Sequence, residues 1–259
     1  MDDIGTPLPI TEDAARRIGM RTRGHLLIRV RHELPVGQGF GMSAAGTLAA
    51  SLATASLLGQ PRQRAIEAAH LAELEGRGGL GGVAAILGGG LELRSRPGIP
   101  PWGRIRHLPL RATVWVGVVG PRIDTPDVLS NVRSLARILR AARPLDSLLA
   151  HPSLDAFGRE SERFTDAAGL ASPRLRRLLR ALRGRDTWAA QAMFGTSFFV
   201  LARSPGARGR IAQVVEDHKV RAVEVPLARG GARPLPEADW TAVSPRRKDF
   251  RGGRARRAP

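Results

Sequence analysis

The sequence predicts an α+β fold that is organised as two domains within 259 residues. The alanine-rich stretch SAAGTLAASLATASLL, at 43–58, consists of strong helix formers without proline. The segment SPRLRRLLRALRG repeats leucine at helical spacing with arginines opposite, after a Ser172 cap and Pro173. The β-branched run ATVWVGVVG, at 112–120, is typical of a buried strand. Helices and strands mixed in this way indicate α+β, with a boundary near residue 108.

The remaining elements follow from periodicity and from glycine and proline breaks. Further helices are expected within 7–20, 61–75, 126–143, 153–168, 173–184 and 205–227. Further strands are expected at 25–34, at 91–96 and at the end of 205–227. The stretch WAAQAMFGTSFFVLARS is interpreted as a helix, a tight turn at Gly195 and Thr196, and a strand.

A glycine turn, PVGQGFGMSAAG, precedes the alanine-rich helix. Gly37, Gly39 and Gly41 allow positive φ and close approach of the backbone to a ligand. A turn that enters a helix N-terminus presents free N–H groups and the positive end of the helix dipole, which suits a phosphate. Ser43 can offer its hydroxyl to a metal ion. The alternative is an ordinary glycine turn in which Ser43 is the helix N-cap.

Bulk composition excludes several classes of protein. No apolar run approaches the roughly 20 residues of a membrane-spanning helix, and the acidic start is unlike a signal peptide. The absence of cysteine excludes disulfides and thiolate metal sites. We therefore expect a soluble, cytoplasmic protein without a membrane partner.

The net charge of +18 raises the question of nucleic acid. Seven basic residues lie in the last fifteen, a stretch of few apolar residues that we expect to be disordered. Many others occupy helix faces, where a solvated basic surface is the simpler interpretation. With no tyrosine and 4% aromatic residues, no stacking platform for bases is evident. Nucleic-acid binding is therefore not expected apart from nonspecific contacts of the tail.

Three separated segments resemble the GHMP kinases. The glycine turn is similar to their phosphate-binding motif, with matches at Pro35, Gly39, Gly41, Ser43, Ala44 and Ala45, and with Met42 in place of the first serine. AAHLAELEGRGGLGGV corresponds to the place of their metal-binding glutamate, and AMFGTSFF resembles their C-terminal glycine motif. The combination GQGFGMSAAG, AHLAE, GLG-V and GGLELRSRPGIPPWG is similar to the archaeal pantoate kinases in particular. Those enzymes phosphorylate pantoate with ATP to 4-phosphopantoate, on the route to coenzyme A.

The resemblance implies the GHMP kinase fold. The expected divisions are an N-terminal ATP-binding domain like the second domain of ribosomal protein S5, lacking its first strands (1–107), a ferredoxin-like C-terminal domain (108–235) and a basic tail (236–259). Family members are often dimers, so a homodimer is an open possibility.

The resemblance also assigns roles to single residues. The set implied for the ATP phosphates is Gly37, Gly39, Gly41, Ser43, Ala44 and Ala45. The set implied for Mg²⁺ is Ser43 and Glu73. The set implied for pantoate is His70, Arg94 and Thr125. The C-terminal motif that closes the site is Gly195, Thr196 and Ser197. The types suit the chemistry, because Mg²⁺ takes few, oxygen-bearing protein ligands and arginine can clamp a carboxylate.

Each assignment has a plainer alternative. Glu73 competes with Glu67 and Glu75 as a solvated helix charge. His70 on an alanine- and leucine-rich helix is also compatible with a half-buried structural histidine. Arg94 is one of 41 basic residues. Thr125 can be a turn residue before Pro126.

Two departures from the family bear on activity. Pantoate kinases typically read Gly-Leu-Gly-Asp-Val, with the aspartate as the expected base, whereas this chain has Gly82 at that position. Loss of a positioned base typically costs about two to four powers of ten in rate. The glycine motif also begins at Pro35, earlier than in the family, so the first strands of the sheet are missing. A start site placed too late is the favoured explanation, and a degenerate copy is the alternative.

The hypotheses are ranked accordingly. A pantoate kinase is first, and a GHMP-fold kinase for another hydroxylated small molecule is its neighbour. A catalytically impaired, nucleotide-binding relative is second because of Gly82. A nucleic-acid binder is last, because it gives the glycine turn no purpose.

Overall fold

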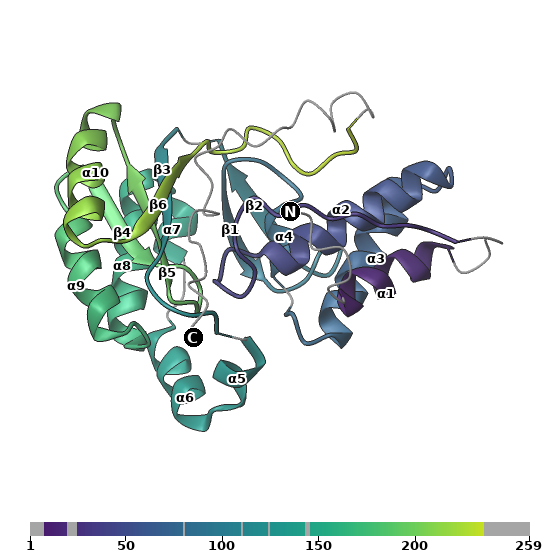
Figure 1. Ribbon diagram of the computed structural model, residues 1–259, viewed down its shortest axis with the longest axis horizontal. Helices are drawn as coiled ribbons and strands as arrows, with labels where there is room; N and C mark the ends of the chain where they lie inside the picture. Colours follow the sequence, from purple (N-terminus) through teal and green to yellow (C-terminus); the bar gives the residue numbers. More distant parts are fainter. Residues whose placement is uncertain are drawn as a thin grey trace, which may run out of the picture.

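The structure, a computed structural model, describes residues 8–19, 25–79, 81–109, 111–123, 125–142 and 146–235. Figure 1 shows two halves side by side, a helical N-terminal half with a short hairpin and a C-terminal half built on a larger sheet. The N-terminal half contains α1 (Pro9–Gly19), α2 (Met42–Leu57), α3 (Arg62–Glu75), α4 (Gly82–Ala85), β1 (Leu91–Arg96) and β2 (Arg104–Leu108). Among the described residues of this half, β1 and β2 form a two-stranded antiparallel sheet.

The C-terminal half follows in chain order. Its strands are β3 (Thr113–Val118), β4 (Thr187–Gln191), β5 (Ser197–Ala202) and β6 (Arg221–Val225). Its helices are α5 (Thr125–Ser130), α6 (Val132–Ala141), α7 (Asp146–Ala150), α8 (Leu154–Ala168), α9 (Pro173–Leu182), the 3₁₀ turn η1 (Pro205–Ala207) and α10 (Arg208–Asp217). The predicted helix over 126–143 is thus two helices, which Asn131 separates by capping α6.

The four strands are antiparallel, in the order β4-β5-β3-β6. Helices connect β3 to β4 and β5 to β6, whereas β4 and β5 form a hairpin. This strand–helix–strand–strand–helix–strand sequence in this order is the ferredoxin-like arrangement. At its centre, Val116 of β3 pairs with Phe199 of β5 and Val223 of β6.

The two faces of this sheet bury different partners. On one face, the leucines of α9 and Ile211 of α10 pack against Phe198 and Val200. The predicted leucine stripe is confirmed, since its four members are buried: Leu175, Leu178, Leu179 and Leu182. The other face packs Val114 and Val116 together with residues of β1 and β2, so one apolar cluster joins the two halves.

The N-terminal half is held by small side chains. Helices α2 and α3 meet through an alanine-rich cluster that also holds Leu48, Leu52 and Ile66, and α4 adds Val83. Alanine lets the backbones of α2 and α3 approach closely, so polar side chains of one helix can contact those of the other.

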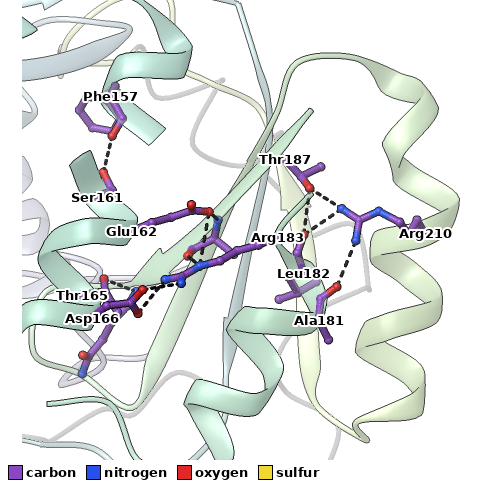
Figure 2. Close-up of polar contacts among 12 residues, drawn as sticks. Phe157, Ser161, Glu162, Thr165, Asp166, Ala181, Leu182, Arg183, Thr187 and Arg210 are labelled. Carbon is purple, nitrogen blue, oxygen red and sulfur yellow. Dashed lines mark hydrogen bonds and ion pairs between the residues drawn. The ribbon is translucent and has the colours of Figure 1, made fainter. Parts of the chain in front are cut away.

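Polar side chains cover the free edge of β4 (Figure 2). Glu162 of α8 accepts a hydrogen bond from the Ala189 N–H at 2.9 Å, and Thr165 accepts one from the Gln191 N–H at 3.2 Å. Arg183 donates to the Ala189 carbonyl at 3.0 Å and grips Asp166 through two bonds of 2.7 and 3.1 Å. Burial raises the pKa of Glu162, and the Ala189 N–H opposes that rise. These contacts satisfy an edge that would otherwise be open to another strand.

Two predicted elements are wrong. The stretch WAAQ, predicted as helix, lies in strand β4 (Thr187–Gln191), in which all five residues are buried. A short, fully buried apolar run has no periodicity that separates helix from strand. Residues 25–34, predicted as a strand, are described but form no ladder. Alternating side chains make a strand only where a neighbouring strand supplies hydrogen-bond partners.

Other expectations are confirmed: the helices within 7–20, 61–75, 153–168 and 205–227, and the strands at 91–96 and 112–120. The division at 107/108 stays a prediction, and the tail 236–259 lies outside the described residues. Within the described part of the chain, no helix has the length and apolar character needed to cross a membrane.

We predict that Arg183→Ala destabilises the protein by about 1–3 kcal/mol, because a forked, charge-assisted contact is lost and the Ala189 carbonyl loses its donor. Thermal unfolding measures the loss. The matched control is Arg180→Ala, an exposed position of the same helix, which should stay within about 0.5 kcal/mol of the parent. Equal melting temperatures for both variants would show that solvent replaces the Arg183 contacts without cost.

Candidate active site

The glycine turn adopts the predicted conformation and leads directly into α2. Gly37, Gly39 and Gly41 have φ of 76°, 80° and 70°. Gly41 is the N-cap of α2, and no side chain caps the helix. The alternative role of Ser43 as N-cap is therefore wrong. The first N–H groups of a 16-residue helix, with the positive end of its dipole, face the turn without a capping side chain.

The Ser43 hydroxyl instead donates to Oε1 of Glu73 at 2.8 Å. Thr47, one turn further along α2, donates to the same oxygen at 3.1 Å. Glu73 is only 2% exposed, so the alternative of a solvated helix charge is wrong. Burial raises the pKa of the Glu73 carboxyl, while the two hydroxyls act in the opposite direction. The contact brings two oxygen-bearing side chains together beside the helix N-terminus.

The segment 78–90 is rich in glycine, and at several of its glycines a side chain from elsewhere lies so close that a Cβ would collide with it. A Cβ at Gly78 would lie 2.9 Å from the Glu73 carboxyl carbon, and a Cβ at Gly81 would lie 2.9 Å from Cζ of Arg94. A Cβ at Gly82 would overlap that of Ala44 in α2. These glycines thus bring Glu73, Arg94 and the start of α2 together around one loop.

Arg94 reaches this loop from strand β1. Leu91 and Leu93 are buried in the shared cluster, so the alternating positions 92 and 94 lie on the opposite face of the strand. Nε of Arg94 lies 3.6 Å from Oε1 of Glu92, and the Arg94 side chain is 26% exposed. The guanidinium is thus held against Gly81 and remains accessible to a ligand.

His70 lies one helical turn before Glu73 and is also buried, at 9% exposure. Burial lowers the pKa of its imidazole, which favours the neutral form. Its Nε2 lies 3.9 Å from the Cβ position of Gly98, in the turn that joins β1 and β2. Thr125 begins α5, and its side chain is outside what the structure describes.

The C-terminal motif packs on the glycine turn from the other half. A Cβ at Gly39 would lie 2.9 Å from the Ala192 carbonyl carbon, and one at Gly195 would lie 3.0 Å from the Gly39 nitrogen. Ser197 donates to the Gln38 carbonyl. Thr196 donates to the Gln38 side chain at 3.1 Å. Two glycine-containing turns that are far apart in the sequence thus meet backbone to backbone.

Sequence reasoning missed two residues of this site. Gln38 bonds to Thr196 and Ser197 and also donates to the Gly120 carbonyl at 3.1 Å. Thr47 completes the Glu73 contact. Helical spacing from Ser43 gave a signal for Thr47, because i and i+4 share a face. Nothing local distinguishes Gln38, since its partners are more than 80 positions away.

The structure therefore brings Ser43, Ala44, Glu73 and Arg94 to one loop, and Gly39 to Gly195. It does not test their roles in binding or catalysis, which stay predictions. Among the described residues, no group of three or more histidine or acidic side chains could hold a metal ion. A metal would instead use few protein ligands, and the Ser43–Glu73 oxygen pair provides two.

Comparison with known proteins identifies the class. Residues 10–90 match the family "GHMP kinases N terminal domain". Among solved structures, the chain is similar to the Methanococcus jannaschii mevalonate kinase, with TM-score 0.61 and 11% identity over 84% of this chain and 74% of that one. It is also similar to the Cytophaga hutchinsonii homoserine kinase, with TM-score 0.61 and 19% identity over 90% and 81%. The chain has the GHMP kinase fold.

Within this class, the chain is similar to pantoate kinases and to a phosphotransferase related to coenzyme A biosynthesis. It is 31% identical over 176 residues to the pantoate kinase of Thermococcus kodakarensis, covering 68% of this chain and 59% of that protein. It is 32% identical over 173 residues to the pantoate kinase of Methanospirillum hungatei, covering 66% and 57%. A solved "phosphotransferase related to CoA biosynthesis pathway" aligns with TM-score 0.66 and 28% identity, over 87% and 75%. The chain spans less than two thirds of the length of each of these pantoate kinases.

We predict that Glu73→Gln raises stability at pH 7. The raised pKa means that the folded state favours the protonated carboxyl, so stability is present below the ordinary pKa near 4.5 and is lost as the pH rises through the folded-state value. Glutamine keeps an oxygen that can accept hydrogen bonds from the hydroxyls of Ser43 and Thr47, and it carries no buried charge. Unfolding curves at pH 4 and pH 7 measure the effect, with about 2–4 °C in Tm for each 1 kcal/mol.

The control for this substitution is Glu67→Gln, at the surface of the same helix, where the carboxylate accepts a bond from Gln63 at 2.9 Å. The free energy of unfolding of Glu67→Gln should stay within about 0.5 kcal/mol of the parent at both pH values. If the variant Glu73→Gln gains nothing at pH 7, the two hydroxyls compensate fully for burial of the charge.

We also predict that Gly39→Ala and Gly41→Ala differ, although both glycines have positive φ. Gly41 has no neighbouring atom within 4 Å of its Cβ position, so alanine there costs only the left-handed backbone, about 1–2 kcal/mol. Alanine at Gly39 adds a collision with Ala192 and should cost clearly more. Denaturant unfolding of the two variants measures the difference, and equal losses would argue against the contact between the two turns.

Proposed function

We propose that this chain is an ATP-dependent kinase that phosphorylates pantoate to 4-phosphopantoate in coenzyme A biosynthesis. The observation that carries the proposal is the Ser43–Glu73 pair, set at the start of α2 directly after three glycines with positive φ. The resemblance to pantoate kinases over two thirds of the chain supports the choice of substrate.

The glycine turn and the first turn of α2 suit the ATP phosphates. Three positive-φ glycines let backbone N–H groups approach the ligand, and the helix dipole favours its negative charge. Phosphoryl transfer needs positioning and charge neutralisation more than covalent chemistry, which this arrangement can supply. The contact of Gly195 with Gly39 then holds the turn in place from the other half.

Ser43 and Glu73 would hold Mg²⁺. Both offer oxygen, the ligand type that Mg²⁺ prefers, and the raised pKa of Glu73 indicates a carboxylate that would gain from a nearby cation. When bound, the ion neutralises charge on the phosphates. Thr47 donates to the same carboxylate oxygen as Ser43 and would keep Glu73 in position beside the ion.

Arg94, His70 and Thr125 would bind pantoate. The partly exposed guanidinium beside Gly81 suits the carboxylate of a hydroxy acid. A neutral His70 can donate or accept a bond to a hydroxyl without adding charge. The expected partner is a small-molecule substrate, pantoate, and a homodimer stays an open alternative.

Gly82 favours a second candidate, a nucleotide-binding relative with impaired catalysis. The position of the expected base has no side chain, and a Cβ there would overlap Ala44. The present packing of α4 on α2 therefore leaves no room for an aspartate without movement of one helix.

We expect a coupled ADP-release assay with ATP, Mg²⁺ and pantoate to show turnover. Ser43→Ala should lower kcat/KM by about 100-fold or more, because a ligand of the metal is lost. Ser56→Ala, exposed on the same helix, should leave turnover unchanged. Absence of turnover with pantoate, together with turnover on another hydroxy acid, would overturn the substrate but keep the kinase.

We further predict that Gly82→Asp alone destabilises the protein through its collision with Ala44. The double variant Gly82→Asp/Ala44→Gly should recover stability and raise kcat by about one to two powers of ten over the parent. Thermal unfolding and the same assay report the two effects separately. Nucleotide binding without turnover in every variant would support the impaired relative.

A further inference from the structure

A hollow of about 460 Å³ lies at the end of β3 and the start of the edge strand β6, beside the glycine turn. Its walls come from the end of β3, the start of β6, the beginning of α9 and Gln38 of the glycine turn. In the fold, α9 and α10 cover the adjoining face of the sheet (Figure 1). Pro35 and Gln38 of the segment that carries the glycine turn line the hollow, but no residue of the predicted phosphate set or of the predicted pantoate set does.

The hollow is lined by positive charge. Arg174, Lys219 and Arg221 are among its walls, and none of its described lining residues is acidic. Arg174 is the second residue of α9, where the positive end of the helix dipole adds to its charge. Its guanidinium donates to the carbonyls of Val119 and Lys219, each at 3.4 Å, and of His218 at 3.5 Å, and the first two of these residues also line the hollow. Such a concentration of cations favours a small anion.

Lys219 occupies an unusual backbone position. It follows the last turn of α10 with φ of +50°, and Val220 N–H bonds back to Val215 at 3.1 Å. This helix ending normally takes glycine, because a side chain in the left-handed region costs about 1–2 kcal/mol. Lysine here is less stable than glycine would be, and Lys219 is one of the residues that line the hollow. An outlier of this kind points to a role in binding rather than in folding.

We propose that this hollow is a second anion site, which takes a small phosphate-bearing molecule independently of the glycine turn. Three cations and a helix N-terminus suit a group with several charged oxygens. The ammonium group of a lysine binds phosphate as a compact positive charge. Gln38 lines the hollow and bonds to Gly120, Thr196 and Ser197, so the site adjoins the contact between the two turns. The proposal does not depend on pantoate being the substrate.

The test is calorimetric titration of the full chain with inorganic pyrophosphate in metal-free buffer, alone and with AMP-PNP at saturation. We expect binding to persist when AMP-PNP fills the nucleotide site. Lys219→Gly should weaken that remaining binding by about tenfold, while the melting temperature stays the same or rises because the left-handed backbone is relieved. Arg177→Ala removes one charge from the exposed face of α9 and serves as the control.

Three results would overturn the proposal. Complete displacement of pyrophosphate by AMP-PNP would make the hollow part of the nucleotide site. Equal weakening by Lys219→Gly and Arg177→Ala would reduce the effect to net charge. Unchanged binding in Lys219→Gly, with the fold intact, would remove lysine from the site.

Discussion

The buried carboxylate of Glu73 is the constraint on which the N-terminal half depends. A carboxylate at 2% exposure is costly unless its oxygens are satisfied, and here the hydroxyls of Ser43 and Thr47 satisfy one of them. This requires α2 and α3 to lie close and in one register, which their alanines allow. The same contact sets Ser43 at the start of α2. A carboxylate that burial destabilises, next to an uncapped helix N-terminus, is therefore a cost to folding, and under the proposed function it is the group that would hold a cation.

Close packing also explains why glycine is frequent in the two loops of the site, 37–41 and 78–90. In 78–90 they admit Glu73, Arg94 and Ala44 against the backbone, and in 37–41 they admit the turn at Gly195. Their number reflects contacts made by other residues as much as flexibility of the loop. Gly82 differs from the other glycines, because it stands where related kinases are expected to have the aspartate that acts as base. Ala44 of α2 occupies the space that a side chain at this position would need.

The sheet of the C-terminal half positions the turn that packs against the glycine turn of the N-terminal half. One of its faces is closed by α9 and α10, and the other joins β1 and β2 in a single apolar cluster. This arrangement holds the turn at Gly195 against Gly39, while Glu162, Thr165 and Arg183 close the outer edge of β4. The halves are therefore coupled both through the core and through the two turns.

The sequence by itself determined what depends on local conformation. Positive φ at three glycines, the helix after them and the leucine stripe of α9 follow from residue types and spacing, because backbone freedom and amphipathic burial are local properties. Tertiary structure decided the rest. Residues 25–34 have a strand pattern without a partner strand, and the short run WAAQ becomes a strand because its neighbour is β5. Gln38 gains its role only from residues more than 80 positions away, and Glu73 differs from Glu67 and Glu75 only in what packs on it. The partners of Gln38 and the burial of Glu73 are set by the whole fold, so no local pattern could reveal them.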